Sequence, residues 1–431
     1  MHIKPSGRFA QGKKFKLKLH IPPALQHYRY RYLWIGLLVS VAGSQMQSAA
    51  IHWHIRDLTG VPDPMALGGI GLARILPVII FSIIGGTVAD NYNRRNILFI
   101  TQTILALQAL VLAYLTFSGQ ITIQYIYIMT ALQASAMAFD LPARQSLVPN
   151  LVPRDVLPSA FSMNTIAFNV GAIGGPLLLG FVPEGALGYA YLINAVSFLA
   201  VLLALFFMGD VPQNVNKAGG INLYAMLDGV RFIFKRPLIS STMLMDFIAT
   251  FFASANTMLP IVARDILDVG KTGFVWLTSA QAIGSVGAGL VVSQFPKIRK
   301  QGKLFFASVL VFGLATILFG FSTTFALAMI SLFLIGAADA VSTVIRNTIR
   351  QMQTPDHIRG RMTSVNQIFF MGGPQLGEVE AGLVAVAFGV PFAIISGGIG
   401  CILGLGFVAW KWPQLQAYNG DEPTLAGAPA D

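Results

Sequence analysis

Long apolar segments alternate with short polar breaks along nearly the whole chain. An α-helix needs about 20 mostly apolar residues to cross a bilayer. On this criterion we predict twelve membrane spans, over residues 32–57, 65–89, 96–117, 121–143, 156–182, 187–208, 238–262, 272–294, 304–322, 325–347, 360–387 and 390–410. These segments are too long for barrel strands, which alternate over roughly 10 residues. The pattern therefore predicts an all-α polytopic membrane protein.

The composition supports this interpretation. Of the 431 residues, 55% are hydrophobic and 11% are charged, whereas a soluble domain carries about 25% charged residues. The single cysteine, Cys401, lies in an apolar run, so neither an intrachain disulfide nor a cysteine-rich metal site is expected. The first apolar run has the length of a full span, which favours a membrane helix over a signal peptide.

Basic residues lie mostly on one side of the predicted membrane. The N-terminal tail, the breaks after the even-numbered spans with the span ends beside them, and the C-terminus hold 25 of the 29 Lys and Arg residues. By the positive-inside rule, we expect both termini to be cytoplasmic. The same rule accounts for the net charge of +11, so the basic tail "GKKFKLKLH" is expected to flank the membrane and not to bind nucleic acid.

The second half of the chain repeats the first with an offset of about 200 residues. The matching positions are Asp140 and Asp339, Pro153 and Pro355, Asn164 and Asn366, and Gly175-Pro176 and Gly373-Pro374. Two similarly oriented sets of six spans make a parallel repeat about an axis along the membrane normal. We expect a basic tail over 1–31, six-helix bundles over 32–208 and 238–412, a linker with an amphipathic segment over 209–237, and a cytoplasmic tail over 413–431.

The polar break after the second span, "GGTVADNYNRRNIL", has the form Gly-x-x-x-Asp-x-x-x-Arg-Arg. It resembles the loop signature of the major facilitator superfamily, with Asn91 and Asn93 where that signature usually has Arg and Gly. The segments "FDLPARQSLVPNLVPRD" and "DHIRGRMTSVNQIFFMGGPQLGEVEAG" resemble the enterobactin-exporter-like branch, the drug:proton antiporter-3 group. This resemblance implies the major facilitator fold, with twelve helices in two parallel halves, and transport by alternating access.

We interpret the loop as a conformational latch. The Asp90 carboxylate is expected to meet the positive N-terminus of the eleventh-span helix near Ile358. Arg94 or Arg95 is expected to pair with Asp140, and each such contact is worth about 1 kcal/mol. The alternative is that the two arginines only enforce topology. The predicted latch residues are Gly86, Asp90, Arg94, Arg95, Asp140 and Arg144.

Small residues are dense in the fifth span, where "GAIGGPLLLG" contains Gly171, Gly175, Pro176 and Gly180. Such residues let helices approach closely and bend. The resemblance to the fifth-helix motif of antiporters implies a hinge or a packing seam against the eighth span, where "GSVGAGL" supplies small residues. Ordinary helix packing is the alternative.

Charged groups within the spans are the main functional candidates, because burying them is costly. Arg74 and Glu378 lie about 24 and 25 Å from the cytoplasmic ends of their helices. We expect these two to meet, either as a proton-coupling gate or as a permanent ion pair. Asp246 lies about 15 Å into its span without an obvious cationic neighbour. It is therefore expected to bind a proton during transport, and the alternative is a capped polar contact.

The substrate cavity is expected at mid-depth between spans one, four, seven and ten. Amide groups in an apolar cavity suit a bulky amphipathic molecule. The candidate lining residues are Gln45, Gln133, Asn164, Asn256 and Asn366.

The sequence contains no P-loop, no metal-binding spacing and no Gly-x-Ser-x-Gly elbow. We therefore expect no enzymatic activity, no cofactor and no metal. The favoured function is a proton-coupled exporter of a drug, macrolide or siderophore, working as a monomer among the lipids of a bacterial inner membrane. A lysophospholipid transporter with a lateral opening is the first alternative. A membrane enzyme or scaffold is the second alternative. It would require a soluble catalytic domain, and the tails are too short to form one.

Overall fold

The computed structural model describes residues 22–213, 231–252, 254–295 and 298–420. Within these ranges, the side chains of Ile83, Asp90, Ala255 and residues 356–361, 363–365, 367–368 and 370 lie outside the description. Most of the predicted basic tail and linker, including most of the amphipathic segment, and part of the predicted C-terminal tail also lie outside it.

The N-terminal part is built from long helices joined by short connections. After the short α1 (Pro23–Gln26) come α2 (Tyr28–Thr59), α3 (Pro64–Asn91), α4 (Arg94–Phe117), α5 (Ile123–Leu147), α6 (Leu157–Gly180) and α7 (Gly188–Met208). Side chains cap the N-termini of several of these helices. At α3, Asp63 accepts a hydrogen bond from the N–H of Ala66, and at α4, Asn93 accepts one from the N–H of Arg95. Such caps satisfy backbone donors at the first turn. Each of these long helices overlaps one predicted span.

The C-terminal part follows the same plan with one broken helix. It contains α9 (Pro237–Phe252), α11 (Gly270–Ser293), α12 (Gln301–Gly320), α13 (Phe325–Met352), α14 (Asp356–Phe388), α15 (Val390–Lys411) and the short α16 (Pro413–Ala417). The predicted seventh span continues past α9 as the 3-10 turn η3 (Ser254–Met258), then α10 (Leu259–Ile261) and the π-helical turn η4 (Val262–Ile266). Pro260 contributes no backbone N–H and disfavours a regular helix there.

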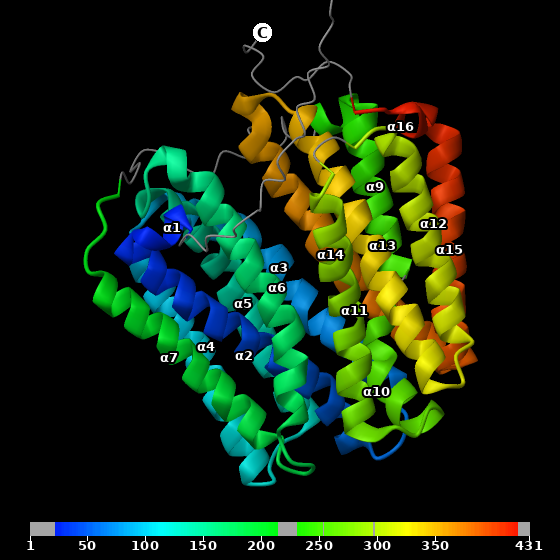
Figure 1. Cartoon of the computed structure of the whole chain (residues 1–431). Coiled ribbons are helices and arrows are strands. Elements are labelled where there is room, and N and C mark those ends of the chain that lie inside the picture. Colours follow the sequence, from blue (N-terminus) through cyan, green and yellow to red (C-terminus); the bar gives the residue numbers. More distant parts are fainter. Residues whose placement is uncertain (1–21, 214–230, 253, 296–297, 421–431) are drawn as a thin grey trace, which may run out of the picture.

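The helices form two groups, α2–α7 and α9–α15 (Figure 1). They are joined where α3 packs against α14 and where α6 packs against α11. One buried apolar cluster runs from Met46 and Ile51 of α2 to Phe274 and Leu277 of α11, so the two groups share a core there. We call the end that carries α1 and α16 the terminal end. The opposite end, where the connections after α2 and α6 lie, is the distal end (Figure 1).

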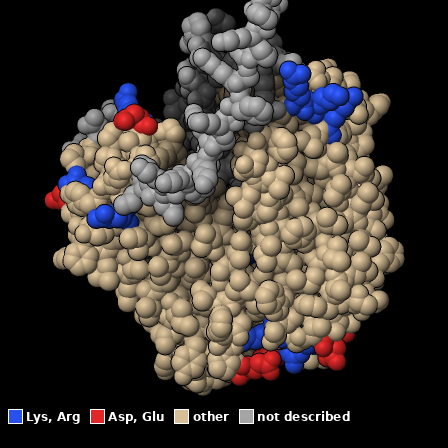
Figure 2. Space-filling view, viewed as in Figure 1, with Lys and Arg blue, Asp and Glu red and all other residues tan. Residues whose placement is uncertain are grey.

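The described helices fit a membrane protein. Nine of the described segments are long and apolar enough to span a bilayer. On the face shown in Figure 2, charged residues gather toward the two ends, and a broad band between them shows other residues. The long helices that do not meet the criterion are α2, α5 and α14. Polar residues interrupt their sequences, such as Gln45 and His52 in α2 and Glu378 in α14. The predicted fold class is confirmed, and the number of crossings stays a prediction.

The small residues of α6 mostly face α2. A Cβ atom added to Gly175 would lie 2.5 Å from the Cβ of Gln45, and one added to Gly171 would lie as close to Val41. Only the last glycine of the motif, Gly180, faces α11, where its Cβ would lie 3.5 Å from Val275. The two groups do meet where α6 packs against α11. The expected use of Gly171 and Gly175 in that contact was wrong, because their side of the helix is covered by α2.

Other glycines bring helix backbones into direct contact. On α3, a Cβ added to Gly71 would lie 2.2 Å from the carbonyl oxygen of Gln375, so this glycine lets the two helix groups touch. Gly336 of α13 is packed still more tightly, because its Cβ would lie 1.9 Å from the carbonyl oxygen of Gln281 on α11. Both positions therefore require the absence of a side chain.

Gly336→Ala is expected to lower the stability of the protein by about 1–3 kcal/mol, because overpacking of this size forces backbones apart. Gly287→Ala on α11 is the matched control, since a Cβ there would have no neighbour within 4 Å. Thermal unfolding of both purified variants in detergent would measure the difference. A Gly336→Ala protein as stable as the Gly287→Ala protein would contradict this packing.

Candidate functional site

A cavity of about 390 Å³ lies between the two groups of helices. Its polar lining includes Gln45, Ser48, His52, Arg74, Asn256, Thr257, Thr278, Gln281, Ser285, Asp339 and Glu378. Its apolar lining includes Ala49, Ala172, Pro176, Leu259, Phe274 and Ala282. The broken helix supplies Asn256 and Thr257 from η3, so the interruption of the seventh predicted span exposes polar groups to the cavity. Cavities of this size with mixed linings are typical of small-molecule sites.

Arg74 and Glu378 meet in the wall of this cavity. Arg74 on α3 and Glu378 on α14 approach to 3.6 Å, and Arg74 also donates to the Ser48 hydroxyl at 3.1 Å. The Thr257 side chain lies beside the Glu378 carboxylate. The matched depths in the sequence therefore predicted the approach of these side chains, which we call the gate pair. Their role in proton coupling stays a prediction.

The predicted cavity residues divide into two sets. Gln45 and Asn256 line the cavity, and the amide nitrogen of Asn256 donates to the side-chain oxygen of Gln281 at 2.7 Å. The other three lie outside its lining. Asn164 accepts from the Tyr30 hydroxyl at 2.8 Å, and the side-chain oxygen of Asn366 accepts from Arg350. Gln133 is a partly buried residue of α5.

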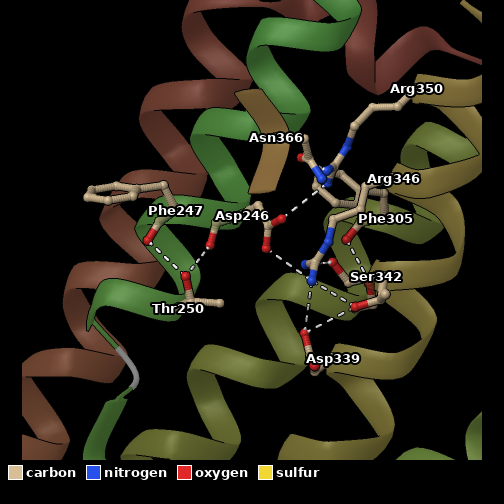
Figure 3. A network of polar contacts seen from close by, with 11 residues as sticks. Asp246, Phe247, Thr250, Phe305, Asp339, Ser342, Arg346, Arg350 and Asn366 are labelled. Atoms are coloured by element: carbon tan, nitrogen blue, oxygen red, sulfur yellow. Dashed lines mark hydrogen bonds and ion pairs between the residues drawn. The ribbon is translucent and has the colours of Figure 1, made fainter. Parts of the chain in front are cut away.

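Asp246 belongs to a buried charge network, formed by Asp246, Asp339, Arg346, Arg350 and Asn366 (Figure 3). Its two carboxylate oxygens pair with Arg346 at 3.0 Å and with Arg350 at 3.2 Å. The expectation of a carboxylate without a cationic neighbour was therefore wrong. Two guanidinium groups from α13 hold the two carboxylate oxygens of Asp246 in ion pairs, and its role in proton coupling stays a prediction.

The sequence reasoning missed the two arginines of this network. Arg346 and Arg350 lie at the end of the tenth predicted span, where the positive-inside rule already accounts for basic residues. Their side chains are only 4% and 3% exposed. The signal that could have found them is their spacing from Asp339, since steps of seven and eleven residues place all three on one helix face.

The predicted latch residues have other partners in this conformation. The carboxylate of Asp140 is held by Arg144, one turn further along α5, and by the Thr101 hydroxyl and Gln102 amide of α4. The pairing of Asp140 with Arg94 or Arg95 is therefore wrong here, because a nearer cation and two polar groups already satisfy it. Arg95 instead meets Asp210 at 3.3 Å.

The remaining latch residues, Arg94, Gly86 and Asp90, have few described contacts with other helices. The guanidinium group of Arg94 donates to the Ala89 carbonyl. A Cβ on Gly86 would meet no neighbour within 4 Å. The side chains of Asp90 and Ile358 lie outside the description, so the contact expected between Asp90 and the start of α14 stays a prediction.

Two reciprocal ion pairs join the groups at the distal end. The chain carries Arg56-Asp57 near the end of α2 and Arg264-Asp265 in η4. Arg56 pairs with Asp265, while Arg264 pairs with Asp57 at 2.7 Å. We call these four residues the distal clasp. Close to it, the Lys271 ammonium group donates to the Val182 carbonyl across the same interface. These contacts join the two groups of helices at the distal end.

Asp246→Asn is expected to destabilise the protein by about 3–5 kcal/mol, because it leaves two buried guanidinium groups without their shared counter-charge. The double variant Asp246→Asn/Arg350→Gln should recover part of this loss. Asp210→Asn is the control, since it removes a fully exposed carboxylate that also pairs with an arginine. Thermal unfolding in detergent measures the coupling between the two sites, and additive losses would argue against the network.

Comparisons with known proteins support a transport function for this architecture. The family model described as transmembrane secretion effector matches residues 22–423. The chain is 25% identical to the staphyloferrin A transporter of Staphylococcus aureus, over 86% of this chain and 94% of that protein. It is 22% identical to the multidrug efflux pump Tap of Mycolicibacterium fortuitum, over 88% and 94% of the two chains. It is also 22% identical to the enterobactin exporter EntS of Citrobacter koseri, over 94% and 96%.

Solved transporters share the fold. A POT family transporter in complex with 5-aminolevulinic acid gives a TM-score of 0.72 at 13% identity, covering 90% of this chain and 96% of that one. A bacterial homologue of the human lysosomal transporter Spinster, in an inward-facing and occupied conformation, gives 0.72 at 13% identity, covering 92% and 98%. The resemblance to the enterobactin-exporter-like branch is confirmed. The protein is a multi-pass membrane transporter and not an enzyme, and it belongs to the transmembrane secretion effector family of the major facilitator superfamily.

Proposed function

We propose that the protein exports amphipathic small molecules across a bacterial inner membrane by alternating access, in exchange for protons. The observation that carries the proposal is the central cavity, whose lining comes from both groups of helices and combines amide, charged and apolar side chains. The relatives named as exporters of siderophores and drugs add support. The basic residues favour a cytoplasmic terminal end, which makes the distal end periplasmic.

On this assignment, the distal clasp is the periplasmic gate. Its two pairs differ in burial, because Arg56 is 4% exposed while Arg264 and Asp57 are 39% and 44% exposed. An exposed pair contributes less than about 1 kcal/mol. A buried arginine that loses its carboxylate costs about 3–5 kcal/mol. The Arg56–Asp265 pair should therefore contribute most of the free energy that keeps the distal end closed. For this end to open, water or new partners must replace the pair.

The gate pair is our candidate for proton coupling. Its side chains are 21% and 13% exposed, so both are shielded while the distal end is closed. When that end opens, Arg74 and Glu378 separate and become hydrated. Glu378 is then the carboxylate that binds a periplasmic proton, since its partner has moved away. Closure with a protonated Glu378 and return of the proton to the cytoplasm complete the cycle.

Reversal of one charge in the distal clasp should open the periplasmic side. In a Cys401→Ser background with a reporter Ser48→Cys in the cavity, Arg56→Asp is expected to increase labelling by a membrane-impermeant thiol reagent added to the periplasmic face. The exchange Arg56→Asp/Asp265→Arg should return labelling toward the parent level. Arg264→Ala, which breaks the exposed pair, should have a much smaller effect. Equal labelling of the parent, Arg56→Asp and exchanged proteins would exclude a gating role.

The transport cycle itself is tested with everted membrane vesicles and a panel of drugs, siderophores and lysophospholipids. We expect accumulation of a drug or siderophore that depends on an acidic vesicle interior. Glu378→Gln and Arg74→Gln should each impair accumulation, and the double variant should recover expression and thermal stability, since a lone buried charge costs more than none. Proton dependence that survives in the double variant would make the pair a structural gate only. Accumulation restricted to lysophospholipids would contradict the drug and siderophore assignment.

A further inference from the structure

Among the charged residues of the described cavity lining, which are Arg74, Asp339 and Glu378, Asp339 has the most exposed side chain. Its side chain is 43% exposed, whereas those of Arg74 and Glu378 are 21% and 13% exposed. Arg346, which stands behind Asp339, is 4% exposed. A ligand in the cavity therefore meets the carboxylate of Asp339 before it meets that guanidinium group.

The partners of Asp339 hold it weakly. Arg346 reaches its Oδ1 atom at 3.4 Å, and the Thr343 hydroxyl lies at 3.5 Å. The same nitrogen of Arg346 is closer to Asp246, at 3.0 Å. Within the described residues, no hydrogen bond to Oδ2 of Asp339 accompanies these contacts. A second cation can therefore bind Asp339 while Arg346 keeps its pair with the buried Asp246.

The remaining charges of the lining favour a positive ligand. Arg74 and Glu378 neutralise each other in the gate pair. Asp339 is the remaining charged residue of the described lining, and its counter-charge, Arg346, is buried outside that lining. His52 adds an acceptor: its Nδ1 atom lies 2.7 Å from the Ser48 carbonyl. Because a carbonyl only accepts, Nδ1 carries the hydrogen, and the Nε2 atom of the neutral ring can accept from a ligand.

We propose that Asp339 recognises the cationic group of the substrate, so that the cavity selects amphipathic cations over anions of the same size. The apolar lining, with Phe274, Leu259 and Ala172 among its members, takes the hydrophobic part of the molecule. This inference rests on the proposed export function and narrows its substrates to positively charged compounds. Attraction to a carboxylate is strong in such a cavity, because the surrounding protein and lipid screen charge poorly.

Tetraphenylphosphonium and tetraphenylborate provide the test, since they have similar size and shape and opposite charge. Equilibrium dialysis with the purified full chain in detergent should show binding of the phosphonium in preference to the borate. Asp339→Asn should weaken phosphonium binding by about tenfold or more, as expected for the loss of a partly shielded charge pair. Asp339→Glu should retain most of the binding. Glu380→Gln, which removes an acid of α14 outside the cavity lining, is the matched control and should bind normally.

Two outcomes would overturn the inference: equal or tighter binding of the borate, or unchanged phosphonium binding in a stably folded Asp339→Asn protein. Vesicle transport separates this result from the proposed function. Binding that depends on Asp339 without gradient-driven flux would refute the export cycle and leave the charge recognition standing. Export of anionic compounds at the same rate with and without Asp339→Asn would support the export cycle and refute the charge recognition.

Discussion

A charge buried in a membrane-spanning helix bundle needs a counter-charge, and this constraint organises the interior of the protein. Isolated ionised groups are too costly in a medium of low dielectric constant. Asp246 accordingly receives two arginines, Asp140 receives one, and Glu378 receives Arg74 from the other group of helices. The helices that carry Gln45, Asp140 and Glu378 are also the long helices that fall short of the apolar criterion for a span. Their polar faces can stay in the bundle because partner groups are supplied there.

The same constraint explains what the sequence could and could not predict. The helix positions follow from local hydropathy, so each predicted span overlaps a helix or the broken seventh segment. The approach of Arg74 to Glu378 followed from two depths and the known pairing of helices in the fold. Partners that depend on side-chain direction were harder to predict. Arg346 and Arg350 follow an apolar run, and only the orientation of α13 turns them toward Asp246.

The sequence was equally unable to predict which helix packs against a given helix face. The glycines of α6 indicate that another helix packs closely against it, but their spacing does not show whether that helix is α2 or α11. Asp140 shows a similar limit. Its nearest cation in the sequence, Arg144, is one helical turn away, whereas the predicted partners, Arg94 and Arg95, lie at the start of a different helix, α4. Residues four apart on a helix are neighbours on its surface, so the geometry of α5 alone brings Arg144 to Asp140.

The internal repeat places acids at equivalent positions and the two halves use them differently. Asp140 is fully buried and is bonded to Arg144, Thr101 and Gln102. Asp339 is partly exposed to the cavity and shares its arginine with Asp246. The difference comes from the neighbouring helix, since α4 presents hydroxyl and amide groups to Asp140, whereas α9 presents a second acid that competes for Arg346. The repeat thus supplies matching positions, and the neighbouring side chains give the two acids different surroundings: Asp140 is buried among its own partners, whereas Asp339 shares Arg346 with Asp246 and stays partly exposed.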